Sequence, residues 1–264
     1  MAASDIAATG MHAMKTKMET LTGNVANSKT IAYKAQEVEF KDTIYQMYQP
    51  AGMPIGDTGY LTPTAFQVGT GVRVGSTYRH LTKGEAISTE NPLDFYIDGP
   101  GYVRVTYPDD TSVYTQACNF TLNEQRQIVT SEGYLVEDGF TFPENTVDIY
   151  VNRQGEIYAK VDGEQDPQLI GTLSLTVFNN PRGLEAISEN FYRETAASGA
   201  PIEGQPDSTG YGSILQKHIE ASNVQLITQM TGIIDAQICY QACSEVIKKD
   251  NQRKEVDISL ARTS

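Results

Sequence analysis

The first two dozen residues carry apolar side chains at the spacing of a coiled-coil helix. The positions recur in steps of three and four residues, at Ala7, Met11, Met14, Met18, Leu21 and Val25. This spacing places the whole row on one stripe of an α-helix. Ser4 or Asp5 can cap the start, and polar residues from Asn24 to Thr30 end the pattern. A stripe this narrow is marginal alone in water, so we expect the helix to need a partner.

The other end of the chain repeats the pattern and offers that partner. Its row also advances in steps of three and four, through Leu226, Met230, Ile233, Gln237, Tyr240, Ser244 and Ile247. Ile227, Ile234 and Ile238 widen the row to one side. We predict that the two terminal helices pair as a coiled coil and then meet copies of themselves. Periodicity alone leaves open the alternative of two ordinary amphipathic helices on a globular core.

Between these helices the pattern changes to that of β-structure. Residues 31–48 lack a clean helical period and predict an extended arm, with one short helical piece near residues 39–48. Eight glycines and prolines between Gln49 and Val74 exclude a long regular element there and predict a long loop or hairpin. From Gly71 to about Asn223, short alternating runs are separated by frequent turn signals. That arrangement predicts an antiparallel β domain.

The predicted fold class is therefore α+β, with paired terminal helices, an antiparallel β-rich middle and a long extended loop or hairpin. We divide the chain into an N-terminal helix (1–30), an extended arm and loop (31–74), a β-rich domain (75–221) and a C-terminal helix (222–264). The alternating apolar residues of the last ten positions, 255–264, leave their conformation open.

Composition narrows the range of functions. Hydrophobic residues make up 39% of the 264, which favours an elongated or assembled protein over a thick-cored enzyme. The formal net charge of -13 argues against nucleic acid or an anionic membrane as a partner. No apolar run is long enough for membrane insertion, and the N-terminus lacks the pattern of a secretory signal.

Residues with catalytic or metal-binding chemistry are few and scattered. The three histidines, His12, His80 and His218, have no metal-ligand spacing. The three cysteines contain no CxxC pair, and no serine lies in a GxSxG motif. We considered a glycosidase-like carboxylate pair and a cysteine nucleophile, and neither has supporting residues. The prediction is no enzyme activity, no cofactor, no metal and no catalytic residue.

Several motifs do match a known family, in order along almost the whole chain. They are Asn24-Val25-Ala26-Asn27 with Thr30, Tyr33 and Lys34; Asn91-Pro92-Leu93-Asp94 with Ile97, Gly99, Gly101 and Tyr102; Glu194-Thr195-Ala196-Ala197-Ser198-Gly199-Ala200-Pro201; and Glu220, Ser222, Asn223 and Val224. On these residues the chain resembles the flagellar axial proteins, the family of basal-body rod and hook subunits. The stretch from Glu194 to Pro201 points to its distal rod branch.

The resemblance implies a structural role in the bacterial flagellum. Such proteins pass through the flagellar type III export apparatus without a cleaved signal. They polymerise into a hollow helical rod that crosses the periplasm, between the proximal rod proteins and the hook protein and inside the L- and P-ring proteins. The helices would line the core, the β domain would face outward, and the loop near residues 49–74 would stiffen the rod. The polymer seam is then expected to comprise Met11, Met14, Met18, Leu21, Val25, Leu226, Met230, Ile233, Ile234 and Tyr240.

Some residues depart from the family pattern. Ala32, Cys118, Arg126 and Lys217 stand where the family usually has glycine, and three of these positions are expected to lie in turns. A sister axial protein, either another rod subunit or a hook protein, remains an alternative, as does a soluble glycan-binding β module with helical arms. Helical parameters, subunit number, ring contacts and source lineage cannot be read from the sequence.

Overall fold

A computed structural model describes residues 3–55, 60–109, 111–137, 139–163, 166–188 and 190–263. The chain forms two compact units. Unit 1 contains residues 1–26, 36–79 and 225–264, and unit 2 contains residues 27–35 and 80–224. The segment 27–35 belongs to unit 2 although the residues on both sides of it belong to unit 1. The polypeptide therefore passes between the two units four times.

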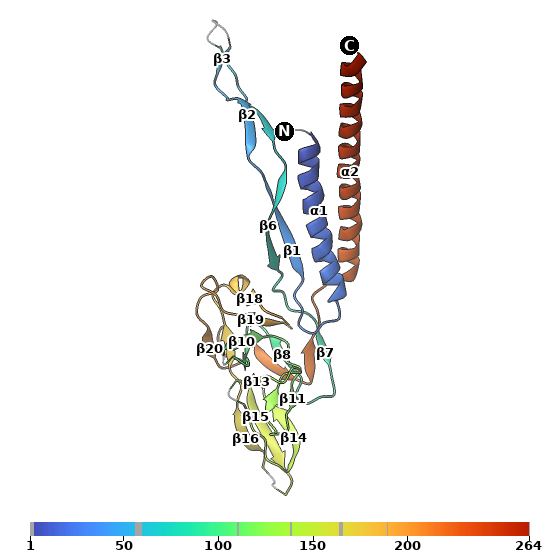
Figure 1. Cartoon of the computed structure of the whole chain (residues 1–264). Coiled ribbons are helices and arrows are strands. Elements are labelled where there is room, and N and C mark those ends of the chain that lie inside the picture. Colours follow the sequence, from blue (N-terminus) through green and yellow to red (C-terminus); the bar gives the residue numbers. More distant parts are fainter. Residues whose placement is uncertain are drawn as a thin grey trace. The chain divides into compact units, whose positions relative to one another are not determined.

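Unit 1 consists of two long helices and a two-stranded β-ribbon (Figure 1). Its elements are α1 (Ala3–Ala26), β1 (Gln36–Asp42), β2 (Tyr45–Gln49), β3 (Pro54–Ile55), β4 (Tyr60–Leu61), β5 (Phe66–Gly69), β6 (Val72–Arg79) and α2 (Leu226–Thr263). The ribbon is built from successive antiparallel pairs, β1 with β6, β2 with β5 and β3 with β4. Helix α1 packs against α2 and also contacts β1 and β6.

Both predicted terminal helices are present, although the boundaries of the second differ from those expected. Helix α2 begins at Leu226 and not at Ser222 or Asn223. The Asn223 side chain is already engaged outside the helix, because its Oδ1 accepts from the Ala35 N–H at 2.7 Å and its Nδ2 donates to the His80 carbonyl at 2.8 Å. At the other end, the sequence left residues 255–264 undecided, and α2 continues to Thr263.

From Gln36 onward the described part of the predicted arm forms the β-ribbon, whereas residues 31–35 lie in no strand and belong to unit 2. The short helical piece predicted near residues 39–48 is wrong, because this stretch lies in β1 and β2. In β1 half-buried and exposed residues alternate, with Val38 and Phe40 on the half-buried face. That period of two is the pattern of a strand that covers a surface on one side only. The hairpin predicted for residues 49–74 is confirmed for its described residues.

Unit 2 is an antiparallel β structure, as the sequence predicted. Its elements are β7 (Ala86–Ser88), β8 (Phe95–Asp98), β9 (Val103–Thr106), β10 (Ser112–Thr115), β11 (Thr121–Leu122), β12 (Ile128–Val129), β13 (Leu135–Val136), β14 (Thr146–Val151), β15 (Glu156–Val161), β16 (Gln168–Thr172), β17 (Leu175–Val177), the 3-10 helix η2 (Pro181–Gly183), β18 (Glu185–Ala186), β19 (Phe191–Arg193), β20 (Ile202–Gly204), β21 (Ser213–Gln216) and β22 (His218–Glu220).

A seven-stranded sheet in the order β11-β12-β13-β9-β10-β19-β18 forms the largest layer of unit 2. A three-stranded sheet, β14-β15-β16, and the pairs β17-β20, β8-β21 and β7-β22 complete it. The main core contains Phe95, Phe120, Ile157 and Leu175, all at most 1% exposed. This core brings together residues far apart in the sequence, such as Phe95 of β8 and Ile214 of β21, so the unit closes around its own apolar centre.

Among the described residues of unit 2, six that are not glycine lie in the left-handed backbone region, and Ala32, Arg126 and Lys217 are three of them. Ala32, Arg126 and Lys217 have φ values of 54°, 57° and 60°. These are three of the four positions where the resemblance led us to expect glycine, and Cys118 is instead buried in the core. Because a side chain in this region costs about 1–2 kcal/mol, these turns carry backbone strain.

Lys217→Gly should therefore stabilise the protein. The Lys217 side chain is exposed, so its removal relieves the strain without emptying the core. Allowing for the greater freedom of glycine in the unfolded chain, we expect a gain of about 0.5–1 kcal/mol in the free energy of unfolding, measured by urea denaturation. Lys217→Ala removes the same side chain but keeps the strain, and should not change stability. Equal stability of the two variants would contradict this explanation.

Candidate assembly surfaces

Helices α1 and α2 run antiparallel and touch along most of α1. The contacts pair Asn24 with Gln229, Leu21 with Gly232, and Gly10 with Cys243 in succession. A Cβ added to Gly232 would lie only 3.1 Å from Leu21 Cδ1, and one added to Gly10 only 3.2 Å from Cys243 Sγ. The two glycines therefore let the helices approach closely. Glycine inside a helix is about 1 kcal/mol less favourable than alanine, and the close approach of Leu21 explains why Gly232 is nevertheless present.

The side of α2 that faces α1 differs in part from the predicted seam. Its half-buried and buried positions still advance in steps of three and four, through Gln229, Ile233, Ala236, Tyr240, Cys243, Ile247 and Asp250. Ile233 and Tyr240 of the predicted seam belong to this inward row. Leu226, Met230 and Ile234 do not, and they are 45%, 53% and 55% exposed. The predicted α1 residues, Met11, Met14, Met18, Leu21 and Val25, are all half-buried.

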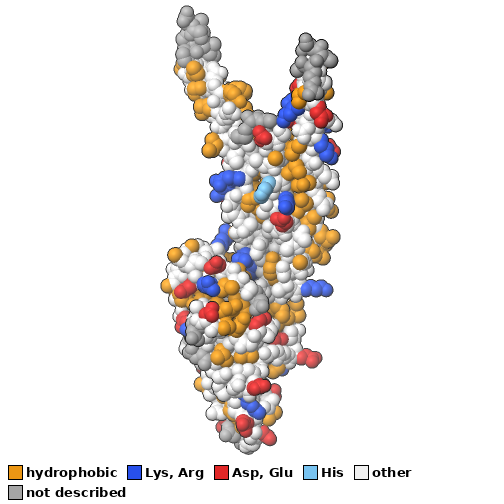
Figure 2. Space-filling view, in the orientation of Figure 1, with side chains coloured by type: hydrophobic (Ala, Val, Ile, Leu, Met, Phe, Trp, Pro, Cys, Tyr) orange, Lys and Arg blue, Asp and Glu red, His pale blue; other side chains and the backbone are white. Residues whose placement is uncertain are grey.

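Four of the exposed apolar residues of α2 form a second row of their own, which we call the outward row. It comprises Ile227, Met230, Ile234 and Ile238, spaced as neighbours on one helix face. Figure 2 shows hydrophobic side chains along this helix. The surrounding stretch from 225 to 244 contains a single charged residue, Asp235. An uncharged helix face with large exposed aliphatic side chains is typical of a contact surface.

The far part of the ribbon is a second surface of this kind. Every residue of β2 and β5 is exposed, among them Tyr45, Met47 and Phe66. Residues 43–71 carry only one charged residue, in a chain that is 20% charged. Interfaces are enriched in Tyr, Phe and Met and depleted in Lys, Glu and Asp. A two-stranded ribbon is also marginal alone, so this surface has the character of one that another protein covers.

A buried asparagine joins the three parts of unit 1. The Asn24 side chain is 1% exposed and lies near the end of α1. Its Oδ1 accepts from the Gln36 N–H at 2.9 Å, and its Nδ2 donates to the Gln36 carbonyl at 2.8 Å and to Gln229 Oε1 at 3.0 Å. One amide thus replaces the missing strand partner of β1 and ties it to α2. Asn24 belongs to a motif that the chain shares with the family, but the spacing of residues along the sequence does not indicate these hydrogen-bond partners.

Unit 2 holds a buried ion cluster at residues close to the chain crossings. Lys34 Nζ donates to Glu220 Oε1, and the two side chains are 1% and 2% exposed. Lys83 Nζ lies 3.3 Å from Glu220 Oε2, and the Gly84 N–H donates to Oε1 at 2.9 Å. Burial lowers the pKa of the Lys34 ammonium, while the Glu220 carboxylate acts in the opposite direction. The cluster joins segment 27–35 to the residues that precede α2.

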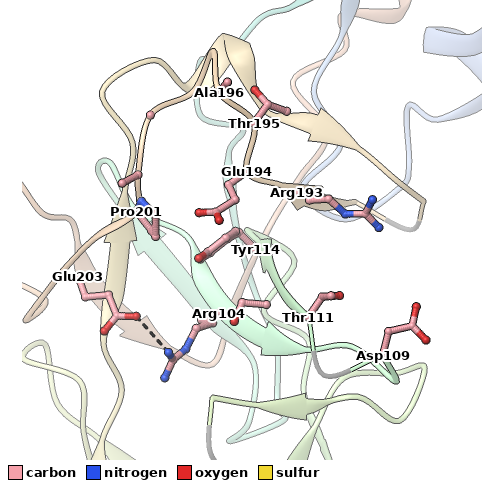
Figure 3. Close-up of a pocket in the computed structure, with 13 residues that line it drawn as sticks. Arg104, Asp109, Thr111, Tyr114, Arg193, Glu194, Thr195, Ala196, Pro201 and Glu203 are labelled. Atoms are coloured by element: carbon pink, nitrogen blue, oxygen red, sulfur yellow. Dashed lines mark ion pairs between the residues drawn. The ribbon is translucent and has the colours of Figure 1, made fainter.

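The stretch from Glu194 to Pro201, the most family-specific of the motifs, lines an open groove of about 1140 Å³ in unit 2. Figure 3 shows Glu194 turned toward Tyr114, and Arg104 paired with Glu203 at 3.2 Å. Arg193 and Asp109 lie further along the groove. Charges of both signs line it, without a nucleophile and base in contact. Such a lining suits a protein contact better than a reaction.

The remaining features give no support to catalysis. The described residues contain no group of three or more His, Cys, Asp or Glu side chains placed to hold a metal ion. Burial raises the pKa of the Cys118 thiol to about 12, which suppresses the thiolate that a cysteine nucleophile would need. Among the described residues, no helix is long and apolar enough to cross a membrane.

Comparisons with known proteins identify the family. The model of the flagellar hook protein FlgE/F/G D1 domain matches residues 96–159, and that of the flagellar basal body rod FlgEFG protein C-terminal region matches residues 215–258. The flagellar basal-body rod protein FlgG of Caulobacter vibrioides is 42% identical over 96% of both chains. The proteins of the same description from Agrobacterium fabrum and Borreliella burgdorferi are 35% and 34% identical, over 94% and 97% of both chains.

This chain belongs to the flagellar basal-body rod protein family. The identity extends over nearly the full length of each relative, so it covers unit 1 and unit 2 alike. Membership confirms the predicted family and a structural role in the basal-body rod, assembled with other axial proteins, in place of an enzymatic one.

Proposed function

We propose that the protein is the subunit of the distal flagellar rod, the hollow helical shaft that crosses the periplasm and transmits torque to the hook. The outward row of α2 is the observation that supports this function most directly. It is an exposed, uncharged aliphatic surface on a protein whose relatives are rod proteins along their whole length. A soluble glycan-binding module would have no use for such a surface on a helix.

The terminal helices supply the polymer contact in this proposal. The α1–α2 pair acts as a coiled coil. Its outward row, which includes Met230 and Ile234, and the adjacent Leu226 pack against the helices of neighbouring copies. Fully burying one such side chain is worth about 1.5–3 kcal/mol, so a few per copy account for a stable polymer. The methionines Met11, Met14 and Met18 adapt to slightly different neighbours because their side chains are flexible.

The other segments take the remaining contacts. We assign residues 1–30 and 222–264 to the inner core of the rod, residues 31–74 to an arm that stiffens it against neighbouring copies, and residues 75–221 to the outer surface. The exposed side chains of β2 and β5 support the arm assignment. The partners are then the proximal rod proteins, the hook protein, the L- and P-ring proteins and, before assembly, the type III export apparatus.

Ile234→Asp should abolish rod assembly while leaving unit 2 folded. Ile234 is 55% exposed and belongs to unit 1, so the new carboxylate costs little in the single chain but cannot be buried in the polymer. The measurements are swimming on soft agar, electron microscopy of isolated basal bodies, and circular dichroism of the purified chain. Met14→Asp should act likewise.

Cys239→Asp is the matched control, because it adds the same charge at an exposed position of α2 that lies about 100° around the helix from Ile238 and off the outward row. It should leave motility close to that of the wild type. Complete rods in Ile234→Asp cells would sink the proposal, and rods whose distal part lacks this chain would favour a sister axial protein.

A further inference from the structure

Helix α2 is longer than its partner, and its last turns extend beyond the start of α1. Lys254 Nζ donates to Ser4 Oγ at 3.3 Å, next to Ala3 where α1 begins. Helix α2 continues to Thr263, as Figure 1 shows at the end marked C. At about 1.5 Å per residue, the stretch after Lys254 adds about 13 Å of helix. We call residues 255–263 the overhang.

The overhang continues the pattern that α1 covers elsewhere. The inward row reaches Asp250 and Lys254 beside the start of α1, and the next step of four leads to Ile258. Ile258 is 57% exposed. In the described part of the chain α1 begins at Ala3, so no turn of α1 lies alongside Ile258. The helix thus presents an aliphatic side chain where its own partner helix has ended.

The start of α2 offers a complementary surface. Leu226, Ile227 and Met230 lie in its first turns, and Ile227 is 82% exposed. The sequence from 221 to 234 contains no charged residue, and Glu220 just before it is buried in unit 2. Glu255 and Asp257, two of the three charged residues of the overhang, flank Ile258 and can remain at the rim of such a contact.

We propose that the overhang of one copy packs on the first turns of α2 in a second copy, head to tail. The proposal rests on the function proposed above, and it specifies which surfaces of the polymer meet. Donor and acceptor are different surfaces at opposite ends of one helix, so the contact is heterologous. A heterologous contact that does not close into a ring generates an open helical filament, which is the form of a rod.

The geometry fixes a spacing. About 30 residues separate the centre of the acceptor near residue 228 from Ile258, which corresponds to about 45 Å along α2. Copies stacked through this contact should therefore repeat about every 45 Å along the stack. The same distance prevents the two surfaces of one copy from reaching each other.

A disulfide ladder tests the contact in assembled rods. Ile227→Cys and Ile258→Cys are introduced together into the full chain carrying Cys239→Ser and Cys243→Ser, and basal bodies from cells expressing it are oxidised. Each copy then has one donor and one acceptor thiol besides the buried Cys118, so denaturing gels run after alkylation should show dimers, trimers and longer oligomers of this chain. Replacing Ile258→Cys by Gln252→Cys, an exposed residue of α2 before the overhang, should lower the oligomer yield about tenfold.

The outcomes separate the two proposals. Monomers alone, dimers alone, or cross-links to another axial protein, from rods that contain this chain, would overturn the head-to-tail contact and leave the proposed function standing. Absence of this chain from rods would overturn both. If the cysteine variant does not assemble, the repeat along stacked copies in wild-type rods, measured by cryo-electron microscopy, decides. A repeat near 45 Å supports the contact, and one below about 35 Å or above about 55 Å excludes it.

Discussion

Glu220→Ala should destabilise the protein by about 3–5 kcal/mol, the cost of leaving a buried ion without its partner. Lys34 is 1% exposed and would keep an ammonium in unit 2 without a facing carboxylate. The Gly84 N–H would also lose its acceptor. Thermal unfolding followed by circular dichroism should show a midpoint lower by roughly 10 °C for a domain of this size.

Two further variants show whether the buried ion is responsible. Glu203→Ala removes the ion pair that Glu203 forms with Arg104 in the same unit. Because the Glu203 side chain is 47% exposed, this change should lower the free energy of unfolding by less than about 1 kcal/mol. The double variant Lys34→Met with Glu220→Leu removes both buried charges and should recover much of the lost stability. A double variant as unstable as Glu220→Ala would mean that the hydrogen bonds to the backbone, and not the charge, dominate.

Asn24→Ala should be the second most damaging change, with a loss of about 2–4 kcal/mol. The substitution removes the acceptor of the Gln36 N–H and the donor to its carbonyl, and orphaned backbone groups cost about 1–3 kcal/mol each. Because the same amide bonds Gln229, α2 loses a tie to α1 and β1 at once. Amide hydrogen exchange should become faster in β1 and in the first turns of α2.

The isosteric variant Asn24→Asp sharpens this test. A carboxylate keeps the acceptor for the Gln36 N–H but cannot donate to the Gln36 carbonyl or to Gln229, and it would be a buried charge. We expect it to be at least as unstable as Asn24→Ala. Thr22→Ala, at an exposed position of the same helix, should leave exchange in β1 unchanged. Normal protection of β1 in Asn24→Ala would refute this role.

Much of the fold follows from local periodicity. The spacing of apolar residues located both terminal helices, and alternation with turn signals located the antiparallel strands. The α1-facing row of α2 was harder to assign, because two overlapping rows obey the same spacing. Leu226, Met230 and Ile234 continue one row, but close packing at Gly232 and Ala236 selects the other. Small residues carry little weight in a pattern of hydrophobic side chains, although they determine how near two helices come.

Long-range polar contacts could not be predicted. Lys34 and Glu220 are 186 residues apart, and nothing in the sequence around either residue indicates that the two are buried together. Asparagine before a helix commonly caps it, whereas the Asn223 side chain forms tertiary hydrogen bonds with the Ala35 N–H and the His80 carbonyl. Lys34, Glu220 and Asn223 stand out in the sequence only as members of the family motifs, and the motifs do not indicate their structural roles.

The separation between Lys34 and Glu220 also dictates an order of events in a polypeptide that emerges from a narrow passage N-terminus first. Glu220 leaves the passage only after more than four-fifths of the chain has emerged, and until then Lys34 has no counter-ion. The early segments are thus kept from completing a native domain on their own. A chain truncated before residue 220 should therefore remain incompletely folded and protease-sensitive. By the same argument, a chain that emerges from such a passage should complete its fold only when its C-terminal helix has followed.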